Sequence, residues 1–340
     1  MTEAEKTKKR KKEKVAKEVD GDRPTASRGR NYTLSLAVAS SVVGNVRNIS
    51  NAASVAAQIA RAAVAGLVDE IVVYDDERGA SESTSSFLSL ALQYLETPPY
   101  LRTVLCPLEA TWQTALQKLG AIGAPHHLGQ TEWMPYREGV VLKSSSQTTQ
   151  IEGGHAFIDA GIDRMVYVPM HLPVMARVTL FLGDQPTSKF VSEYSETMII
   201  AEVVSAMTPR MKHGLYNGFV IRVATSLHAV MKECPYKSGY DLTIGTSVRG
   251  VQRGHADLVL PRFSHGLVLF GGMYRGLADI MQYETDFAGK NPEDLFNIFL
   301  NICPSQGCKS LRTEDAVLLA IGYLRPALLH YGGDKGNIQC

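Results

Sequence analysis

The sequence predicts an α/β protein whose parallel sheet, covered by helices on both faces, is interrupted by an inserted small β-barrel. Short apolar strands alternate with helices near both ends of the folded region. Such alternation requires crossover connections and hence a parallel sheet. Between residues 136 and 225 the pattern changes to short strands separated by Gly, Pro, Asp and Ser, which is typical of a small closed barrel. With 340 residues, 45% of them hydrophobic, the chain can bury a core of this size.

The first part of the α/β domain is expected to begin at Asn31. An apolar run at 34–40 predicts a buried strand, and residues 51–65 place small apolar side chains on one helical stripe that ends at Gly66. The run at 70–74 predicts a second strand, which stops at Asp75-Asp76. The remaining expected elements of this part are a helix at 83–95, a short strand at 102–106 and a helix at 109–119.

The barrel and the second part of the α/β domain follow. The expected barrel strands are 139–143, 165–168, 176–182, 199–204 and 218–224. Strands are then expected at 241–245, 266–270 and 296–302, and a very apolar helix at 314–329 that ends near Pro326. On this division residues 31–135 and 226–332 form the α/β domain and residues 136–225 the barrel, between a disordered tail (1–30) and a flexible end (333–340).

Charge is concentrated in the first 30 residues, which hold eleven Lys/Arg and six Asp/Glu, with a basic run at 8–12. Charges this dense resist packing, so the segment is expected to be a disordered tail. It could be a nuclear-localisation signal, a contact to RNA phosphates or a solvating tail with no specific partner. The five cysteines form no CxxC pair, which argues against a zinc site or a disulfide framework and favours a reducing compartment. No apolar run reaches the length of a membrane span.

Three strand ends carry loops that could hold a ligand. Residues 267–276 run from a strand into Gly271-Gly272, residues 301–312 pass through a Pro/Gly loop into a helix N-terminus, and residues 241–250 open into a Gly/Thr/Ser/Arg loop. Glycine lets a backbone approach a ligand closely, although each loop alone could be a plain turn. Neither a phosphate loop nor a strand-linked GxGxxG occurs, which disfavours ATP and NAD. His126-His127, Asp75-Asp76 and the cysteines give only weak signals for metal, acid–base or nucleophilic chemistry.

The combination of these loops resembles the SPOUT methyltransferases, which have an α/β trefoil knot. The resemblance rests on residues 270–272, 301–307 and 310–316, within a wider frame at 69–75, 136–141 and 239–247. The resemblance covers residues 32–330. Within the superfamily, the chain is similar to a eukaryotic and archaeal RNA methyltransferase branch that has an inserted OB-like barrel. The resemblance implies a knotted fold, a homodimer and S-adenosyl-L-methionine as cofactor. The implied cofactor-binding residues are Thr246, Gly271, Gly272, Gly276, Asn301, Pro304, Gln306, Gly307, Ser310, Leu311 and Ala316.

The resemblance also implies a reaction, the methylation of rRNA or tRNA by in-line displacement. Arg249 and Arg312 are the candidate catalytic residues, because a guanidinium can anchor phosphate or stabilise an anionic base. The candidate RNA-binding residues are Arg47, Arg61, Arg137, Lys189 and Lys212. RNA and a second copy of the chain are the expected partners, with no membrane and no metal, in the nucleus or nucleolus or else in the cytoplasm. Two alternatives stay open, a non-catalytic RNA-binding ribosome-assembly factor that keeps the knot and an α/β enzyme acting on a small molecule.

Overall fold

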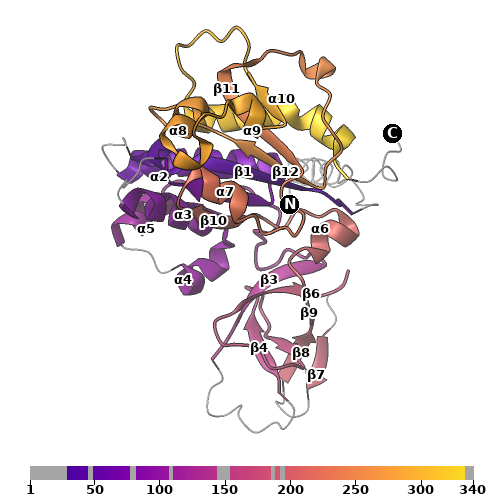
Figure 1. The fold of residues 1–340 in the computed structure, drawn as a ribbon. Coiled ribbons are helices and arrows are strands. Elements are labelled where there is room, and N and C mark those ends of the chain that lie inside the picture. Colours follow the sequence, from indigo (N-terminus) through magenta and orange to yellow (C-terminus); the bar gives the residue numbers. More distant parts are fainter. Residues whose placement is uncertain are drawn as a thin grey trace, which may run out of the picture.

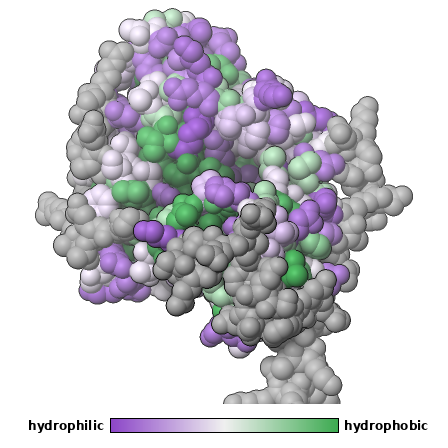
Figure 2. Space-filling view, turned by 90° about the horizontal axis from the view of Figure 1, so that it is seen from below, coloured by the Kyte–Doolittle hydropathy of each residue, from purple (hydrophilic) through white to green (hydrophobic). Residues whose placement is uncertain are grey.

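The computed structural model describes residues 29–44, 49–76, 82–106, 110–143, 154–184, 188–191 and 196–333. An α/β body carries a smaller β body beneath it (Figure 1). Seen from the side of the smaller body, hydrophobic side chains gather toward the middle of the surface among hydrophilic ones (Figure 2). Most of the expected tail and nearly all of the expected flexible end lie outside the described residues. Arg30 is described, and it forms a 2.7 Å ion pair with Asp69.

The α/β body is built on a six-stranded sheet in which every neighbouring pair is parallel, as the sequence predicts. The two faces of the sheet bury separate cores. Along strand β1 (Thr33–Ala39), Leu34, Leu36 and Val38 face one core, whereas Ala37 and Ala39 face the other. In order across the sheet, the strands are β10 (Val220–Ala224), β2 (Glu70–Tyr74), β1 (Thr33–Ala39), β12 (His265–Leu269), β11 (Leu242–Val251) and β13 (Ile298–Leu300).

Helices cover both faces of this sheet (Figure 1). One group of helices packs in the core with Leu34, Leu36 and Val38, and another group packs in the core on the opposite face. The first group is α2 (Ile49–Ala65), α3 (Glu82–Glu96), α5 (Ala110–Gln117) and α10 (Thr313–Tyr331). The second is α7 (Leu227–Lys232), α8 (Leu277–Tyr283) and α9 (Pro292–Leu295). Among the described residues, no helix is long and apolar enough to cross a membrane.

The smaller body is one curved, barrel-like sheet with its own core, which confirms an inserted β unit. Two of its strands, β4 and β7, were not expected, and the expected strand at 199–204 is two strands, β8 and β9, on either side of Ala201. The order is β7 (Ser188–Val191), β8 (Glu196–Ile200), β5 (Val166–Val168), β4 (Ala156–Asp159), β3 (Tyr136–Val141), β6 (Arg177–Phe181) and β9 (Glu202–Val204).

The strand expected at 218–224 does not belong to the barrel. It is β10, which pairs in parallel with β2 from Val220 opposite Glu70 to Ala224 opposite Tyr74. Arg222 reinforces the pairing through a 2.9 Å ion pair with Glu70. The chain has therefore returned to the α/β sheet before residue 225. The backbone of this strand is satisfied by hydrogen bonds to β2. The sequence pattern alone could not assign the strand to either sheet.

Two other expectations are wrong. Residues 102–106, expected as a strand, contain the short helix α4 (Arg102–Leu105), in which Arg102 donates to the carbonyl oxygens of Thr97 and Leu95. The helix expected at 314–329 is present as α10, but it does not end near Pro326 and continues to Tyr331. Its final turns remain helical because Ala327 and Leu328 are buried in the core, which compensates for the backbone donor that proline lacks.

A buried ionic cluster joins the two bodies. Glu96, at the end of α3, accepts two hydrogen bonds from Arg177 of β6, at 2.7 and 3.0 Å. Arg177 also contacts Glu138 of β3 at 3.0 Å, and His126 Nε2 lies 3.1 Å from Glu96 Oε1. Both carboxylates are 4% exposed or less in their side chains. The cluster thus fixes the inserted sheet against the α/β body through charges that water cannot easily screen.

The cluster predicts how stability depends on pH. Burial alone would raise the pKa of Glu96, but its hydrogen bond to His126 and the charge of Arg177 lower that pKa from 4.5 to about 2. Burial lowers the pKa of the neighbouring His127 from 6.5 to about 4. In both cases the unfolded chain binds the proton more readily, so protonation favours unfolding. We expect the free energy of unfolding to fall as the pH drops from about 6.5 to 4 through His127, and from about 4.5 to 2 through Glu96.

Urea titrations at a series of pH values would measure this dependence, with Glu96→Gln as the comparison. Because glutamine does not titrate, the variant should show a flatter curve between pH 4.5 and 2 than the wild type. Equal slopes for both proteins in that range would contradict the assignment.

Candidate functional site

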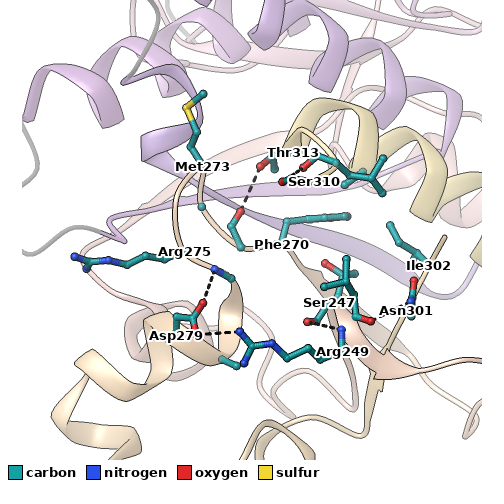
Figure 3. A pocket seen from close by; sticks show the side chains of 18 of the residues that line it. Ser247, Arg249, Phe270, Met273, Arg275, Asp279, Asn301, Ile302, Ser310 and Thr313 are labelled. Carbon is teal, nitrogen blue, oxygen red and sulfur yellow. Dashed lines mark hydrogen bonds and ion pairs between the residues drawn. The ribbon is translucent and has the colours of Figure 1, made fainter. Parts of the chain in front are cut away.

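The three loops singled out in the sequence meet at one cavity of about 250 Å³ in the α/β body. Two of them follow β12 and β13, but the loop expected to open within 241–250 is wrong, because these residues belong to β11 itself, whose pairing with β13 shifts register between Thr246 and Val251. The three strands are neighbours in the sheet, so their carboxyl ends share one edge. Ligands of open parallel sheets bind at such an edge. Figure 3 shows the side chains around this cavity, with Phe270 and Met273 from the loop after β12, Ser247 and Arg249 from β11 and Asn301 from the loop after β13.

The loop after β12 is held from below and from both ends. Phe270 N donates to Ala37 O at 3.0 Å, and the hydroxyl of the fully buried Tyr74 donates to Phe270 O at 2.6 Å. At the far end of the loop, Gly276 N donates to the carboxylate of Asp279 at the start of α8. Burial raises the pKa of Tyr74 well above its usual value, so its hydroxyl keeps the proton that it donates. The backbone of 270–276 is therefore positioned before any ligand binds.

The loop after β13 crosses the extended end of β11. Asn301 N donates to Val251 O at 3.0 Å, and Asn301 Nδ2 donates to Val248 O at 3.1 Å. Farther along, Thr313 Oγ1 lies 3.4 Å from Gly271 O, and Tyr323 of α10 donates to Arg253 O. Residues 301–312 thus begin beside the end of β11, and Thr313, which follows them, contacts the loop after β12.

Nine of the eleven expected cofactor-binding residues line the cavity, namely Thr246, Gly271, Gly272, Gly276, Asn301, Gln306, Ser310, Leu311 and Ala316. Pro304 and Gly307 do not line it. Thr246 and Asn301 use their side chains on the protein itself, since Thr246 Oγ1 donates to Leu269 O and Asn301 bonds Val248 and Cys303. Their side chains shape the loops, which leaves backbone groups and small side chains to face a ligand.

The two candidate catalytic arginines lie in different cavities. Arg249 lines the loop cavity and lies 3.6 Å from Asp279, with 70% of its side chain exposed (Figure 3). Arg312 lines an adjoining cavity of about 690 Å³ beside α2, where Asn51, Ser54 and Gln58 also contribute. The two cavities share Gly272, Met273, Ser310, Leu311 and Thr313.

The candidate RNA-binding residues differ in their exposure to solvent, and two of them have no described side chain. Arg61 on α2 and Lys212 on α6 (Thr208–His213) are exposed, Arg47 lies outside the described residues, and so does the side chain of Lys189. Arg137 is a correction. It is 2% exposed, and its guanidinium donates to backbone carbonyls of Ala160, Glu132, Gly129 and Gly161. Its charge is used inside the protein, where an unpaired guanidinium would be costly.

Several lining residues escaped the sequence analysis. Met273, Tyr274 and Arg275 lie within a loop that was singled out, as do Ser247, Val248 and Lys309, so proximity to the glycines was an available signal. Ser41 and Asp76 support the loop from behind but belong to segments far away in the sequence, so nothing linked them to the glycines, and Asp76 gave only a weak acid–base signal.

The cavity suits a ligand that carries a hydrogen-bond donor and apolar groups. Gln306 Oε1 is buried and has no hydrogen-bond partner in the described part of the chain, so it is free to accept from an amino group. The glycine loop admits close backbone approach, and Phe270, Ile302 and Leu311 supply apolar contacts. S-adenosylmethionine, which carries an amino group that can donate and an adenine ring that can make apolar contacts, meets these conditions. Within the described ranges no group of three or more His, Cys, Asp or Glu side chains could hold a metal ion.

Comparison with known proteins places these features in a family. A family model described as "Putative RNA methyltransferase" matches residues 33–324. A "28S rRNA (uridine-N(3))-methyltransferase" of Homo sapiens is 36% identical over 94% of this chain and 86% of the relative. The Mus musculus protein of the same name is 37% identical over 90% of this chain and 80% of its own length.

A solved structure, the SpoU methyltransferase AviRb from Streptomyces viridochromogenes in complex with AdoMet, is more distant. It aligns with 90% of this chain, which spans 62% of that structure, at 9% identity and a TM-score of 0.34. A TM-score this low supports no conclusion about this chain. The family model and the relatives are sufficient without it: this chain belongs to the RNA methyltransferase family whose model it matches over most of its length.

Proposed function

We propose that the protein transfers the methyl group of S-adenosylmethionine to a base in ribosomal RNA, with N3 of a uridine in 28S rRNA as the first position to test. The convergence of three loops on one cavity at the carboxyl edge of the sheet carries this proposal. The names of the relatives, which are 28S rRNA (uridine-N(3))-methyltransferases, support the choice of RNA and atom. A nuclear or nucleolar location, proposed from the basic run at 8–12, suits a ribosomal RNA substrate.

The protein would hold the cofactor through the backbone of the loop at 270–276 and through the loop at 301–311. Gln306 Oε1 offers an acceptor, and Leu311 and Ile302 offer apolar contacts. When bound, the cofactor supplies a methyl group on a positively charged sulfur. The contribution of the chain is orientation, since holding two reactants in near-attack geometry is worth roughly 7–11 kcal/mol of a barrier.

Arg249 is our candidate for the residue nearest the chemistry. N3 of a uridine must lose a proton to become a nucleophile, and a guanidinium stabilises the resulting anionic base. Arg249 is mostly exposed and its contact with Asp279 is 3.6 Å long, so the side chain can turn toward an RNA base. Arg312, 79% exposed beside the adjoining cavity, is proposed to contact the RNA backbone, together with Arg61, Lys212, Lys189 and Arg47.

The test is an assay of the purified protein with methyl-labelled S-adenosylmethionine and 28S rRNA, followed by mass spectrometry of the nucleosides. Label in N3-methyluridine supports the proposal, and label in another nucleoside keeps the reaction class but changes the atom. RNA binding without cofactor binding would favour an assembly factor. Label that appears only in a metabolite would favour a small-molecule enzyme.

We also propose that the protein acts as a homodimer through α10 and the end of β11. Leu318, Leu319 and Val248 are 56%, 41% and 56% exposed, so a second copy of the chain would find apolar side chains to bury on both elements. We expect Leu318→Glu to convert a dimer into a monomer in light scattering, because a buried unpaired carboxylate weakens an apolar interface strongly. Val220→Glu, at an apolar position on the edge strand β10 that is 68% exposed, is the control and should leave the mass unchanged.

A further inference from the structure

A serine and a buried aspartate meet behind the glycine loop. Strands β1 and β2 are parallel neighbours with Ala39 opposite Tyr74, so the residues just beyond their ends lie side by side. There Ser41 N donates to Asp76 Oδ1 at 3.1 Å, and Ser41 Oγ donates to Asp76 Oδ2 at 2.6 Å. Ser41 is 5% exposed and Asp76 is 8% exposed. Short hydrogen bonds to a carboxylate are about twice as strong as neutral ones, so this pairing is firmly held.

The hydroxyl of Ser41 also reaches the glycine loop. Met273 N donates to Ser41 Oγ at 3.1 Å. A serine hydroxyl has one hydrogen, and here Asp76 accepts it. Only lone pairs of the oxygen therefore remain to face the Met273 amide. The carboxylate thus determines that Ser41 acts toward the loop as an acceptor.

The same two side chains fill the space beneath Gly272. A Cβ added at Gly272 would overlap Asp76 Oδ2 and would lie 2.7 Å from Ser41 Oγ. The glycine loop therefore rests directly on the pair. On its other side, Gly271, Gly272 and Met273 form part of the wall of the loop cavity.

From this arrangement we infer that Ser41 and Asp76 are positioning residues that set the affinity for the methyl donor by holding the Gly272–Met273 peptide. This inference rests on the proposed function, because it assumes that the loop cavity binds S-adenosylmethionine. Neither side chain lines that cavity, so they act on the cofactor through the loop alone.

The chemistry of the pair predicts the effect of each substitution. In Asp76→Asn the amide can turn its NH₂ group toward Ser41 Oγ, so the serine hydrogen loses its carboxylate acceptor and the oxygen must accept from two donors at once, which weakens its hold on the Met273 amide. In Ser41→Ala the bridge is absent altogether. Either change should weaken binding of S-adenosylmethionine by about tenfold, the loss expected for one hydrogen bond to a charged group.

The experiment is isothermal titration of wild type, Ser41→Ala, Asp76→Asn and the double variant with S-adenosylmethionine. Because the two residues act through one bridge, the double variant should bind no more weakly than the weaker single variant. Asp286→Asn removes a carboxylate from the exposed rim of the neighbouring cavity that Asp76 also borders, and it should bind like the wild type. Independent, multiplying losses in the double variant, or wild-type affinity in both single variants, would overturn the inference.

A second measurement separates this inference from the proposed function. Hydrogen exchange of the cofactor-free protein follows the Met273 amide directly, and it should be faster in Ser41→Ala and Asp76→Asn than in wild type or Asp286→Asn. Failure of the wild type to bind S-adenosylmethionine would refute the proposed function. Unchanged exchange at Met273 would refute the positioning role, whatever the cavity binds.

Discussion

Replacing Arg177 with methionine is expected to lower the free energy of unfolding by about 3–5 kcal/mol, the usual loss when one partner of a buried ion pair is removed. Arg177 is the cation that both Glu96 and Glu138 contact, at 2.7 and 3.0 Å. Without it, two carboxylates whose side chains are only 4% exposed would lose their countercharge at the junction of the two bodies. Urea unfolding followed by circular dichroism would measure the change. If the two bodies unfold separately, the loss will appear as a second transition.

Two further variants test whether the loss of stability comes from the ionic cluster. Arg253→Met removes an exposed arginine whose backbone carbonyl, not its side chain, accepts from Tyr323, so it should shift stability by no more than about 0.5 kcal/mol. Adding Glu96→Gln to Arg177→Met removes one of the orphaned charges and should recover part of the lost stability. A loss equal to that of Arg253→Met would show that the cluster does not hold the bodies together.

Local patterns predicted most of the secondary structure because their signals lie within each element. The strand expected at 70–74 is β2 with the same bounds, since apolar residues there are bracketed by a turn and by two aspartates. The pattern could not predict that β10 pairs with β2, because that pairing joins residues about 150 positions apart. It also could not distinguish a short strand from a helical turn at 102–106, where side-chain bonds from Arg102 to the end of α3 decide the outcome.

The part of the candidate site that contains glycines could be predicted from the sequence. Glycines after apolar strands led to the loop cavity, and the parallel order of β12, β11 and β13 brings those loops together. Charged residues predicted the RNA-binding surface less well. Arg137 has the residue type and the neighbourhood of an RNA contact, yet five carbonyl acceptors surround its guanidinium. Burial depends on tertiary packing, which a basic residue in a strand pattern does not reveal.

Gly271→Ala is expected to weaken binding of S-adenosylmethionine by roughly ten- to a hundredfold. The new Cβ would lie 2.9 Å from Gly276 Cα and 3.0 Å from both Arg275 O and Leu277 N. These are backbone atoms, so a flexible side chain cannot relieve the contact by turning away. Overpacking of this kind costs about 1–3 kcal/mol. The loop can avoid it only by opening, and that would move the wall of the cavity.

Gly307→Ala provides the matched comparison, because a Cβ at Gly307 would meet nothing within 4 Å and the residue does not line the cavity. Calorimetric titration of both variants with S-adenosylmethionine, alongside thermal unfolding of the cofactor-free proteins, separates loop geometry from global stability. The crowding argument requires a large loss of affinity for Gly271→Ala and wild-type affinity for Gly307→Ala. Equal losses in the two variants would mean instead that the ligand itself contacts both glycines, and the cavity would then have to extend farther along the loop at 301–311 than the structure places it.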